Sequence, residues 1–538
     1  MRMELDDAVL ALDDLHLSTG NVEPVSRADA ARQREKAPRL NRDELAATSH
    51  VHRIAVLLFY CNGVATGKRV QTTDGEAYAF RLCRQHAPTK SGRRLLICFC
   101  TACYSVLAHP RILFLPMSNP PTATSAGLIP RLLAPVVRET MESARVTAIV
   151  GPRQAGKTTL VRRIVEERQM TYVTLDDDTA RQAARADPYG FVLALGRPAA
   201  IDELQRAPEL MLALKRVVDD DPQPGSFLVT GSANLQTLPN IVDALPGRAD
   251  YLRLDPLAEA ELSGQSRSII DRLFDPSWSP TSATAAGRQS YVEAVVGGGF
   301  PEARLRSPRA RQRFFDGYVI SLIERDVATA ANLRTTDRLG DTLRLVAARS
   351  GGPAEPYTLG HALGLDGKTA RAHLHALERL FAIRLLPAWS TNLGARITRA
   401  PRVYMADAGL HAHSLGADSD AFLNDLTGAL AGRLLETLVV NEVLRQASWA
   451  AIPTRASFYR DDRQREIDLI LETGQRVVGI EIKASTTANV RDARHLAFLR
   501  DRLGDRFVSG VVIYSGSAGV PLGDRIHALP IGALWAVE

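Results

Sequence analysis

Short apolar runs alternate with longer amphipathic stretches along the part of the chain that begins near residue 126. The short runs are rich in β-branched residues and predict buried strands. They lie at 145–150, 172–175, 199–201 and 227–230. Two amphipathic stretches, 157–168 and 208–218, predict helices between these strands. Strands that alternate with helices are typical of a parallel sheet with helices on both faces, so we expect an αβα core over residues 126–265.

The pattern changes beyond this core. Residues 266–420 predict a linker rich in Ser, Thr and Pro, followed by a mainly helical region. Two short helices within it, 359–363 and 368–380, are joined by Gly364–Gly367, which is a helix-turn-helix pattern. Residues 425–538 predict a second α/β domain. Its expected helices and strands lie at 429–445, 467–471, 477–482, 492–503, 510–514 and 527–530.

The amino-acid composition indicates a globular protein rather than a membrane-spanning one. Hydrophobic residues make up 45% of the 538 residues and charged residues 23%, which is ordinary for a globular protein. No uncharged apolar run reaches the roughly 20 residues of a membrane-spanning helix. The first residues carry acids where a signal peptide would carry bases. We therefore expect a cytoplasmic protein without a membrane partner.

The first part of the chain differs from the rest. Residues 1–116 hold all five cysteines and a net charge of +4, out of +6 for the whole chain. Residues 117–538 are close to neutral at +2, so net charge gives little support for nucleic-acid binding. Residues 1–125 are expected to be either a poorly ordered segment or an over-extended start of translation.

A phosphate-binding motif follows the first predicted strand. Gly151-Pro152-Arg153-Gln154-Ala155-Gly156-Lys157-Thr158 fits G-x-x-x-x-G-K-[ST], and Thr159 continues it. Backbone N–H groups of such a loop converge on phosphate oxygens, and the following helix points its positive end at them. Lys157 is expected to reach the β- and γ-phosphates and Thr158 to bind Mg²⁺, so the motif predicts an ATP or GTP site.

Two acids complete this predicted site. Asp202 and Glu203 end the strand at 199–201. The first acid is expected to hold Mg²⁺, and the second to orient and deprotonate the attacking water, which favours hydrolysis over simple binding. Ser232 or Asn234, after the next strand, is a candidate sensor of the γ-phosphate. Arg248 is a candidate arginine finger, although a solvated arginine in a turn is the commoner case.

These motifs together resemble a bacterial family, the AAA-type P-loop ATP-binding proteins with a C-terminal domain of unknown function 4143. The resemblance runs from about Ile129 to the C-terminus. It rests on many short matches in order: Ile129-Pro-Arg-Leu, the phosphate loop, Ile201-Asp-Glu-Leu-Gln-Arg, Leu228-Val-Thr-Gly-Ser-Ala, Pro246-Gly-Arg, Gly298-Gly-Phe-Pro-Glu, Ile323-Glu-Arg-Asp and Tyr404-Met-Ala-Asp-Ala-Gly-Leu. It implies ATP as the nucleotide and strengthens Arg248 as a finger.

The last domain carries a second candidate site. Asp468 enters one strand, Glu481 and Lys483 end the next on one face, and Glu436 lies on the preceding helix. Asp468 and Glu481 are expected to share a divalent metal, with Lys483 steadying the nucleophile or the phosphate charge. This set resembles the PD-(D/E)xK nuclease superfamily, whose fold is restriction-endonuclease-like. A fold kept only for binding is the alternative.

The helix-turn-helix region, 357–385, looks like a winged helix. Its second helix holds Lys368, Arg371, His373 and Arg379, so DNA contact and a purely structural role both remain open. We therefore expect an ATPase with ATP and Mg²⁺ as cofactors that switches a nuclease-like domain acting on or binding nucleic acid. The alternative is a regulatory switch whose last domain binds a protein partner. A homo-oligomer would follow if Arg248 acts between chains.

Overall fold

The structure is a computed structural model of the whole chain. It describes residues 128–232, 245–278, 288–323, 338–391, 399–424 and 428–536, residues 394 and 396, and two short strands near the start. The chain divides into two units, Met1–Pro120 and Pro121–Glu538. In the first unit the structure describes the antiparallel strands β1 (Lys68–Gln71) and β2 (Ala77–Phe80). The expectations for the rest of residues 1–125 lie outside the described residues.

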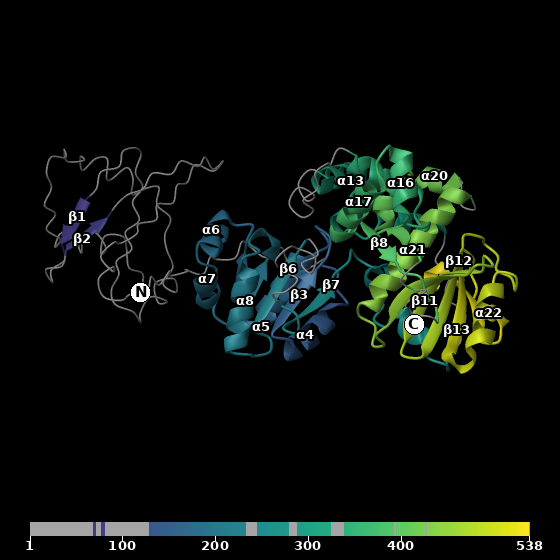
Figure 1. Cartoon of the computed structure of the whole chain (residues 1–538), viewed down its shortest axis with the longest axis horizontal. Coiled ribbons are helices and arrows are strands. Elements are labelled where there is room, and N and C mark those ends of the chain that lie inside the picture. The colour runs from purple at the N-terminus through teal and green to yellow at the C-terminus, as the bar shows by residue number, and fades with distance from the viewer. Residues whose placement is uncertain are drawn as a thin grey trace, which may run out of the picture. The chain divides into compact units, whose positions relative to one another are not determined.

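The second unit begins with a five-stranded parallel sheet whose order is β4-β5-β6-β3-β7 (Figure 1). The expected strands are confirmed to within a residue, and β7 was missed. The strands are β3 (Val146–Val150), β4 (Thr171–Thr174), β5 (Ala199–Asp202), β6 (Phe227–Gly231) and β7 (Ala249–Arg253). Every residue of β3, β5 and β6 is buried, as expected for strands covered on both faces.

Helices cover both faces of this sheet. The expected helix at 157–168 is confirmed as α5 (Lys157–Arg168), and the one at 208–218 as α8 (Leu210–Asp220). The others are α4 (Ala134–Ser143), α6 (Asp178–Ala186) and α7 (Pro188–Leu195). One apolar cluster contains α7, α8 and residues of β5, and a second contains α4, α5 and the opposite side chains of the sheet. The predicted αβα layering is therefore present.

Short helices then lead into the middle of the chain. They are α9 (Glu259–Ser263), α10 (Ile269–Leu273), α11 (Arg288–Gly297), α12 (Pro301–Arg304) and α13 (Pro308–Ser321). α15 (Leu339–Ala348) comes next. The two helices expected at 359–363 and 368–380 follow as α16 (Pro356–Leu363) and α17 (Gly367–Arg379), with Asp366 capping α17 through the N–H groups of Lys368 and Thr369. An antiparallel pair, β8 (Ile383–Leu386) and β9 (Arg402–Met405), comes next.

The structure separates the polar residues that the sequence places on the second of these helices. Lys368 and Arg371 are exposed on α17, but His373 is fully buried and its ring Nδ1 lies 2.9 Å from the hydroxyl of Thr342. The sequence position on an amphipathic helix did not separate the core face from the surface face. His373 therefore has no access to DNA, whatever the exposed cations do.

The last domain is a six-stranded mixed sheet of order β10-β11-β12-β13-β15-β14. It lies next to the long helix α21 (Ala429–Ala447), which follows α19 (Ala408–Ser414) and α20 (Ser419–Asn424), and α22 (Arg494–Leu503) covers the other face. The strands are β10 (Arg455–Arg460), β11 (Glu466–Thr473), β12 (Arg476–Lys483), β13 (Phe507–Tyr514), β14 (Val520–Gly523) and β15 (Ile526–Pro530).

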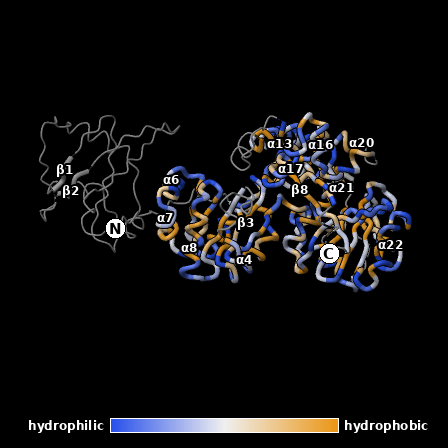
Figure 2. The backbone as a smooth tube through the Cα atoms, viewed as in Figure 1, coloured by the Kyte–Doolittle hydropathy of each residue, from blue (hydrophilic) through white to orange (hydrophobic). Residues whose placement is uncertain are grey.

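The apolar core of the second unit brings together segments that lie far apart in the sequence. α9, α10 and α11 pack with α21 and with the last sheet in one cluster of buried residues. Figure 2 shows hydrophilic colour concentrated on outlying helices such as α6 and α22. Because α21 lies inside the shared cluster, it contacts both the helices that follow the first sheet and the last sheet.

Candidate functional site

The phosphate loop lies where the sequence predicts it, between β3 and α5. Gly156 adopts a left-handed conformation (φ 95°) and caps α5, a turn that favours glycine. A β-carbon on Gly151 would lie 2.0 Å from the carbonyl oxygen of Leu254, so only glycine fits there. Lys157 is buried, and its ammonium group donates to the carbonyl oxygens of Gly151 (3.0 Å) and Pro152 (2.8 Å). The lysine thus lies across the loop that should hold phosphate.

Asp202 ends β5 directly beside this loop. Its carboxylate accepts hydrogen bonds from the hydroxyls of Thr158 (2.8 Å), Tyr172 (2.9 Å) and Thr230. Burial and the nearby Asp202 raise the pKa of Tyr172 to about 12, which keeps its phenol protonated as a donor. Thr158 and Asp202 offer adjacent oxygen atoms, which are the ligands that Mg²⁺ prefers, so these two residues fit the expected ion.

Glu203 follows in a left-handed conformation (φ 60°) that is uncommon for a residue with a side chain. Its N–H donates to the hydroxyl of Thr230 (2.9 Å), and the hydroxyl of Ser232 donates to its carboxylate (3.0 Å). The amide of Gln205 donates to both Ser232 (2.8 Å) and Glu203. The second acid is therefore held against the predicted sensor Ser232, while Asn234 lies outside the described residues.

The second candidate site brings Asp468 and Glu481 onto the neighbouring strands β11 and β12. One oxygen of Asp468 accepts the N–H of Ile482 (2.8 Å), and the other accepts a guanidinium N–H of Arg402 (3.2 Å). One oxygen of Glu481 pairs with Lys483 (2.6 Å). Its other oxygen, Oε2, is buried and has no hydrogen-bond partner among the described residues.

Arg402 was not predicted and lies at the centre of these acids. It belongs to β9, outside the last domain, and only 6% of it is exposed. Its guanidinium forms ion pairs with Asp468, Glu436 (3.8 Å) and Glu466, and stacks over the ring of Phe458 at 4.9 Å. We call Glu436, Glu466, Asp468 and Glu481 the acid cluster.

Burial raises the pKa of two members of the acid cluster. The pKa of Glu436 rises to about 7 and that of Glu481 to about 8, first because both carboxyls are desolvated and second because Asp468 is close. Tyr404 donates to Glu436 at 2.7 Å. Within the part of the chain that the structure describes, no three His, Cys, Asp or Glu side chains converge as metal ligands. The predicted metal at Asp468 and Glu481 does not fit this arrangement.

Comparisons with known proteins agree with this division of the chain. Residues 143–263 match the family described as "AAA domain". This segment is an AAA-type P-loop domain. Residues 288–421 match "Domain of unknown function (DUF8612)", and residues 431–534 match "Domain of unknown function (DUF4143)". Matches to two further families thus follow the AAA match along the chain.

Two of the relatives that align with this chain are named only as uncharacterised proteins. An uncharacterised protein of Mycobacterium tuberculosis is 28% identical over 419 residues, which is 77% of this chain and 86% of that protein. One of Haemophilus influenzae is 21% identical over 296 residues, 53% and 65% of the two chains. The Walker-type ATPase of Pyrococcus abyssi, 16% identical, covers 54% of this chain and 97% of its own with a TM-score of 0.34, too low to add to the fold described above. None of the described helices is long and apolar enough to cross a membrane.

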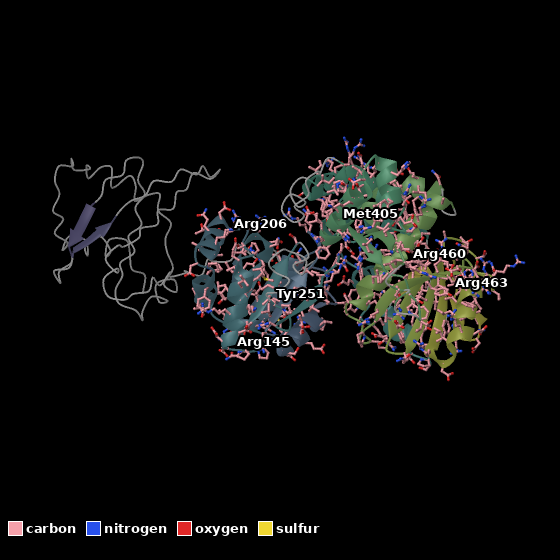
Figure 3. The ribbon with its side chains drawn as sticks, in the orientation of Figure 1. Arg145, Arg206, Tyr251, Met405, Arg460 and Arg463 are labelled. Atoms are coloured by element: carbon pink, nitrogen blue, oxygen red, sulfur yellow. The ribbon has the colours of Figure 1, made fainter. Side chains whose placement is uncertain are left out.

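Arg248 lies at the far edge of the AAA domain from the phosphate loop. Its carbonyl oxygen accepts the N–H of Val146 at the start of β3, whereas the loop follows the end of that strand. Its guanidinium pairs with Asp219 (2.8 Å), which also faces Arg145 (3.7 Å) and whose pKa these arginines lower. Figure 3 labels Arg145 at this edge and Arg206, just after β5, at the opposite one. Arg248 therefore lies away from the phosphate loop of its own chain.

Arg131 is a further residue of the AAA domain site that sequence reasoning did not assign. Its guanidinium donates to the loop carbonyl of Ala155 (2.7 Å), to the carbonyl of Asp255 (2.7 Å) and to Glu261 (2.9 Å). The only signal in the sequence was its place in Ile129-Pro-Arg. It joins the phosphate loop to the segment that leaves the AAA domain.

Proposed function

We propose that the protein hydrolyses ATP in its AAA domain and uses the cycle to change how that domain holds the C-terminal domain. The observation that carries this is the pair Asp202 and Glu203, which follows the end of β5 beside the phosphate loop. Bound Mg²⁺ would add positive charge next to the phosphates and lower the barrier to phosphoryl transfer. Thr158 and Asp202 are the residues that would hold it.

Each residue of the site has a distinct part in this proposal. Lys157 exchanges its two loop carbonyls for phosphate oxygens, because a charge-assisted bond to phosphate is the stronger one. Glu203 leaves Ser232 and Gln205 to orient and deprotonate the attacking water. Ser232 then becomes free to report the state of the phosphate, which is the sensor role proposed for it.

The test of hydrolysis is Glu203→Gln. The amide keeps the shape of the side chain but does not accept a proton, so we expect turnover to fall by about 100-fold while ATP binding persists. Phosphate release and fluorescent-nucleotide binding measure the two separately. A variant that turns over ATP at the wild-type rate would rule out this role for Glu203.

Contacts between the AAA segment and α21 support a switch. The carboxylate of Glu442 accepts the N–H groups of Glu259 (2.8 Å) and Ala260 (3.0 Å) at the start of α9. Arg445 donates to the carbonyl of Leu257 (2.8 Å) and pairs with Asp407 (2.9 Å). All these groups are buried, where such bonds are costly to leave unmade. Movement of residues 255–261 therefore acts on α21.

A second route supports the same coupling. Asp255, whose carbonyl Arg131 holds, pairs through its carboxylate with Arg384 (2.5 Å) at the start of the pair β8–β9. Arg384 also donates to Asn441 (3.1 Å) on α21. The path from the loop carbonyl of Ala155 to α21 thus runs through three side chains. The path ends at Asn441 on α21, the helix that also carries Glu436.

We propose two alternative roles for the C-terminal domain. In the first it is a nuclease-like domain that acts on nucleic acid, with exposed Lys368 and Arg371 of the winged-helix-like region contacting DNA. In the second it only binds a partner. Plasmid nicking with Mg²⁺ or Mn²⁺, wild type against Glu481→Ala, distinguishes them. The guanidinium inside the acid cluster favours the second, and equal background in both proteins would support it.

Arg248 completes a site only between chains in this proposal. Its position at the far edge of the sheet leaves a neighbouring subunit as the place where it would meet phosphate. Mixing the inactive variants Lys157→Ala and Arg248→Ala should then restore activity, because one mixed interface carries both intact groups. Failure to recover activity would argue against an oligomer of this kind.

A further inference from the structure

The acid cluster already contains a cation, because the guanidinium of Arg402 pairs with three of its carboxylates. One of these ion pairs uses Asp468, a carboxylate that the proposed divalent cation would need, and the arginine comes from β9 rather than from the domain that supplies the acids. β9 is part of the pair that also carries Arg384. The cation in the cluster therefore belongs to the region that contacts the AAA domain.

The oxygen atoms of the two proposed metal ligands can be counted. Both oxygens of Asp468 are used, one by the N–H of Ile482 and one by Arg402. Glu481 gives one oxygen to Lys483 and keeps Oε2 without a partner, although the side chain is only 9% exposed. A metal shared by Asp468 and Glu481 would therefore bind an Asp468 oxygen that already accepts a hydrogen bond, next to the permanent positive charge of Arg402.

We infer that Arg402 is a built-in cation that occupies the acid cluster in place of a divalent metal ion and excludes one from it. The inference rests on the proposed nuclease-like identity of Asp468, Glu481 and Lys483. A guanidinium satisfies several carboxylates at once because its donors are fixed in a plane, and it brings a permanent charge. A metal and Arg402 compete for the same oxygen atoms.

A role for Arg402 in binding a substrate phosphate is less consistent with its surroundings. Its guanidinium is buried, faces carboxylates, and is stacked on Phe458. Anionic neighbours repel a phosphate, and the donors of the arginine are already committed. The geometry supports a structural role in which ion pairs of Arg402 join β9 to the last domain.

The test is direct metal binding to the full chain without nucleotide. Mn²⁺ binding to wild type, Arg402→Gln and Arg402→Gln/Glu481→Gln would be measured by calorimetry and by the electron-spin signal of free Mn²⁺. We expect Arg402→Gln to bind one Mn²⁺ at least about tenfold more tightly than wild type, and the double variant to lose that gain. Arg396→Gln is the matched control, since it breaks the ion pair with Glu472 in the same domain but outside the acid cluster.

Two results would overturn the inference. One is Mn²⁺ binding by Arg402→Gln that is no tighter than by wild type. The other needs only wild type and Glu481→Gln: Mn²⁺ binding by wild type that is tighter than about 1 mM and depends on Glu481. That second comparison decides the matter if Arg402→Gln does not fold. ATP turnover, measured in parallel, tests the proposed ATPase function separately, because Arg402 touches no residue of the phosphate site.

Discussion

The two acidic sites of this protein hold their carboxylates in opposite ways. In the AAA domain, hydroxyl groups of Thr158, Tyr172 and Thr230 surround Asp202. In the C-terminal domain, the cations Arg402 and Lys483 surround Asp468 and Glu481. Neutral hydroxyls can turn or become ligands themselves when a metal arrives, whereas a buried guanidinium must leave.

This contrast shows that a set of acids in the right order along a sequence does not define a metal site. Both sites show short acid-containing motifs at strand ends, and both were predicted to bind a divalent ion. What differs is the third partner, which comes from a distant segment in each case: Thr158 from the phosphate loop and Arg402 from β9. The chemistry of a carboxylate depends on the charge of its neighbours.

The largest expected effect is a loss of ATP turnover when Lys157 is replaced, compared with the same replacement of Lys483. Lys157→Ala should reduce ATP binding and turnover by about 100-fold or more, because its ammonium group lies across the phosphate loop, where it would meet the phosphates. Lys483→Ala should leave ATP turnover at the wild-type level. Steady-state phosphate release measures both. Undiminished activity in Lys157→Ala would remove the ATP site from the position that the motif gives it.

A smaller effect tests the link between the sites. Glu442→Ala should lower the free energy of unfolding by about 2–4 kcal/mol, since it leaves the N–H groups of Glu259 and Ala260 buried without a partner. Chemical denaturation measures it. The control is Glu302→Ala, which removes an exposed ion pair with Arg306 and should cost less than about 1 kcal/mol. Equal losses in the two variants would mean that α21 does not depend on this contact.

The smallest expected effect concerns pH. Burial raises the pKa of Glu481 from its ordinary value of 4.5 to about 8, so the native state holds the proton more tightly than the unfolded state. The stability that this carboxyl contributes is complete below about pH 4.5 and is lost as the pH rises through about 8. Wild type should therefore lose about 1–3 kcal/mol relative to Glu481→Gln over that range. Parallel unfolding profiles of the two proteins would contradict the burial of a proton there.

Much of the fold was accessible from the sequence because its elements are set by local pattern. Gly151 follows the end of β3 and Gly156 caps α5, and β3, β5 and β6 are mostly apolar and buried throughout because both faces are covered. β7 and β10 were missed, since only part of each is buried and their sequences carry charges. Edge strands of this kind show no continuous apolar run.

The candidate sites show the same difference between local motifs and long-range contacts. The phosphate loop and the Asp202–Glu203 pair are local motifs, so their positions were predicted. Arg131 and Arg402 act on residues at least 24 positions away, and no spacing rule connects them to their partners. His373, one of the residues for which DNA contact and a structural role both stayed open, belongs to the core. Long-range contacts depend on the packing of whole elements, which a single sequence does not reveal.

The position of Phe381 affects where the chain can be cut to leave a stable fragment. It adopts a left-handed conformation (φ 58°) at the turn between α17 and β8, and its ring belongs to the apolar cluster of the AAA domain, beneath the guanidinium of Arg253 at 4.9 Å. A chain cut after residue 263 would therefore lack a side chain of its own interior and the carboxylate that caps α9. The segment that matches the AAA family, residues 143–263, is therefore shorter than the cooperative folding unit, and a stable fragment for crystallisation should retain both.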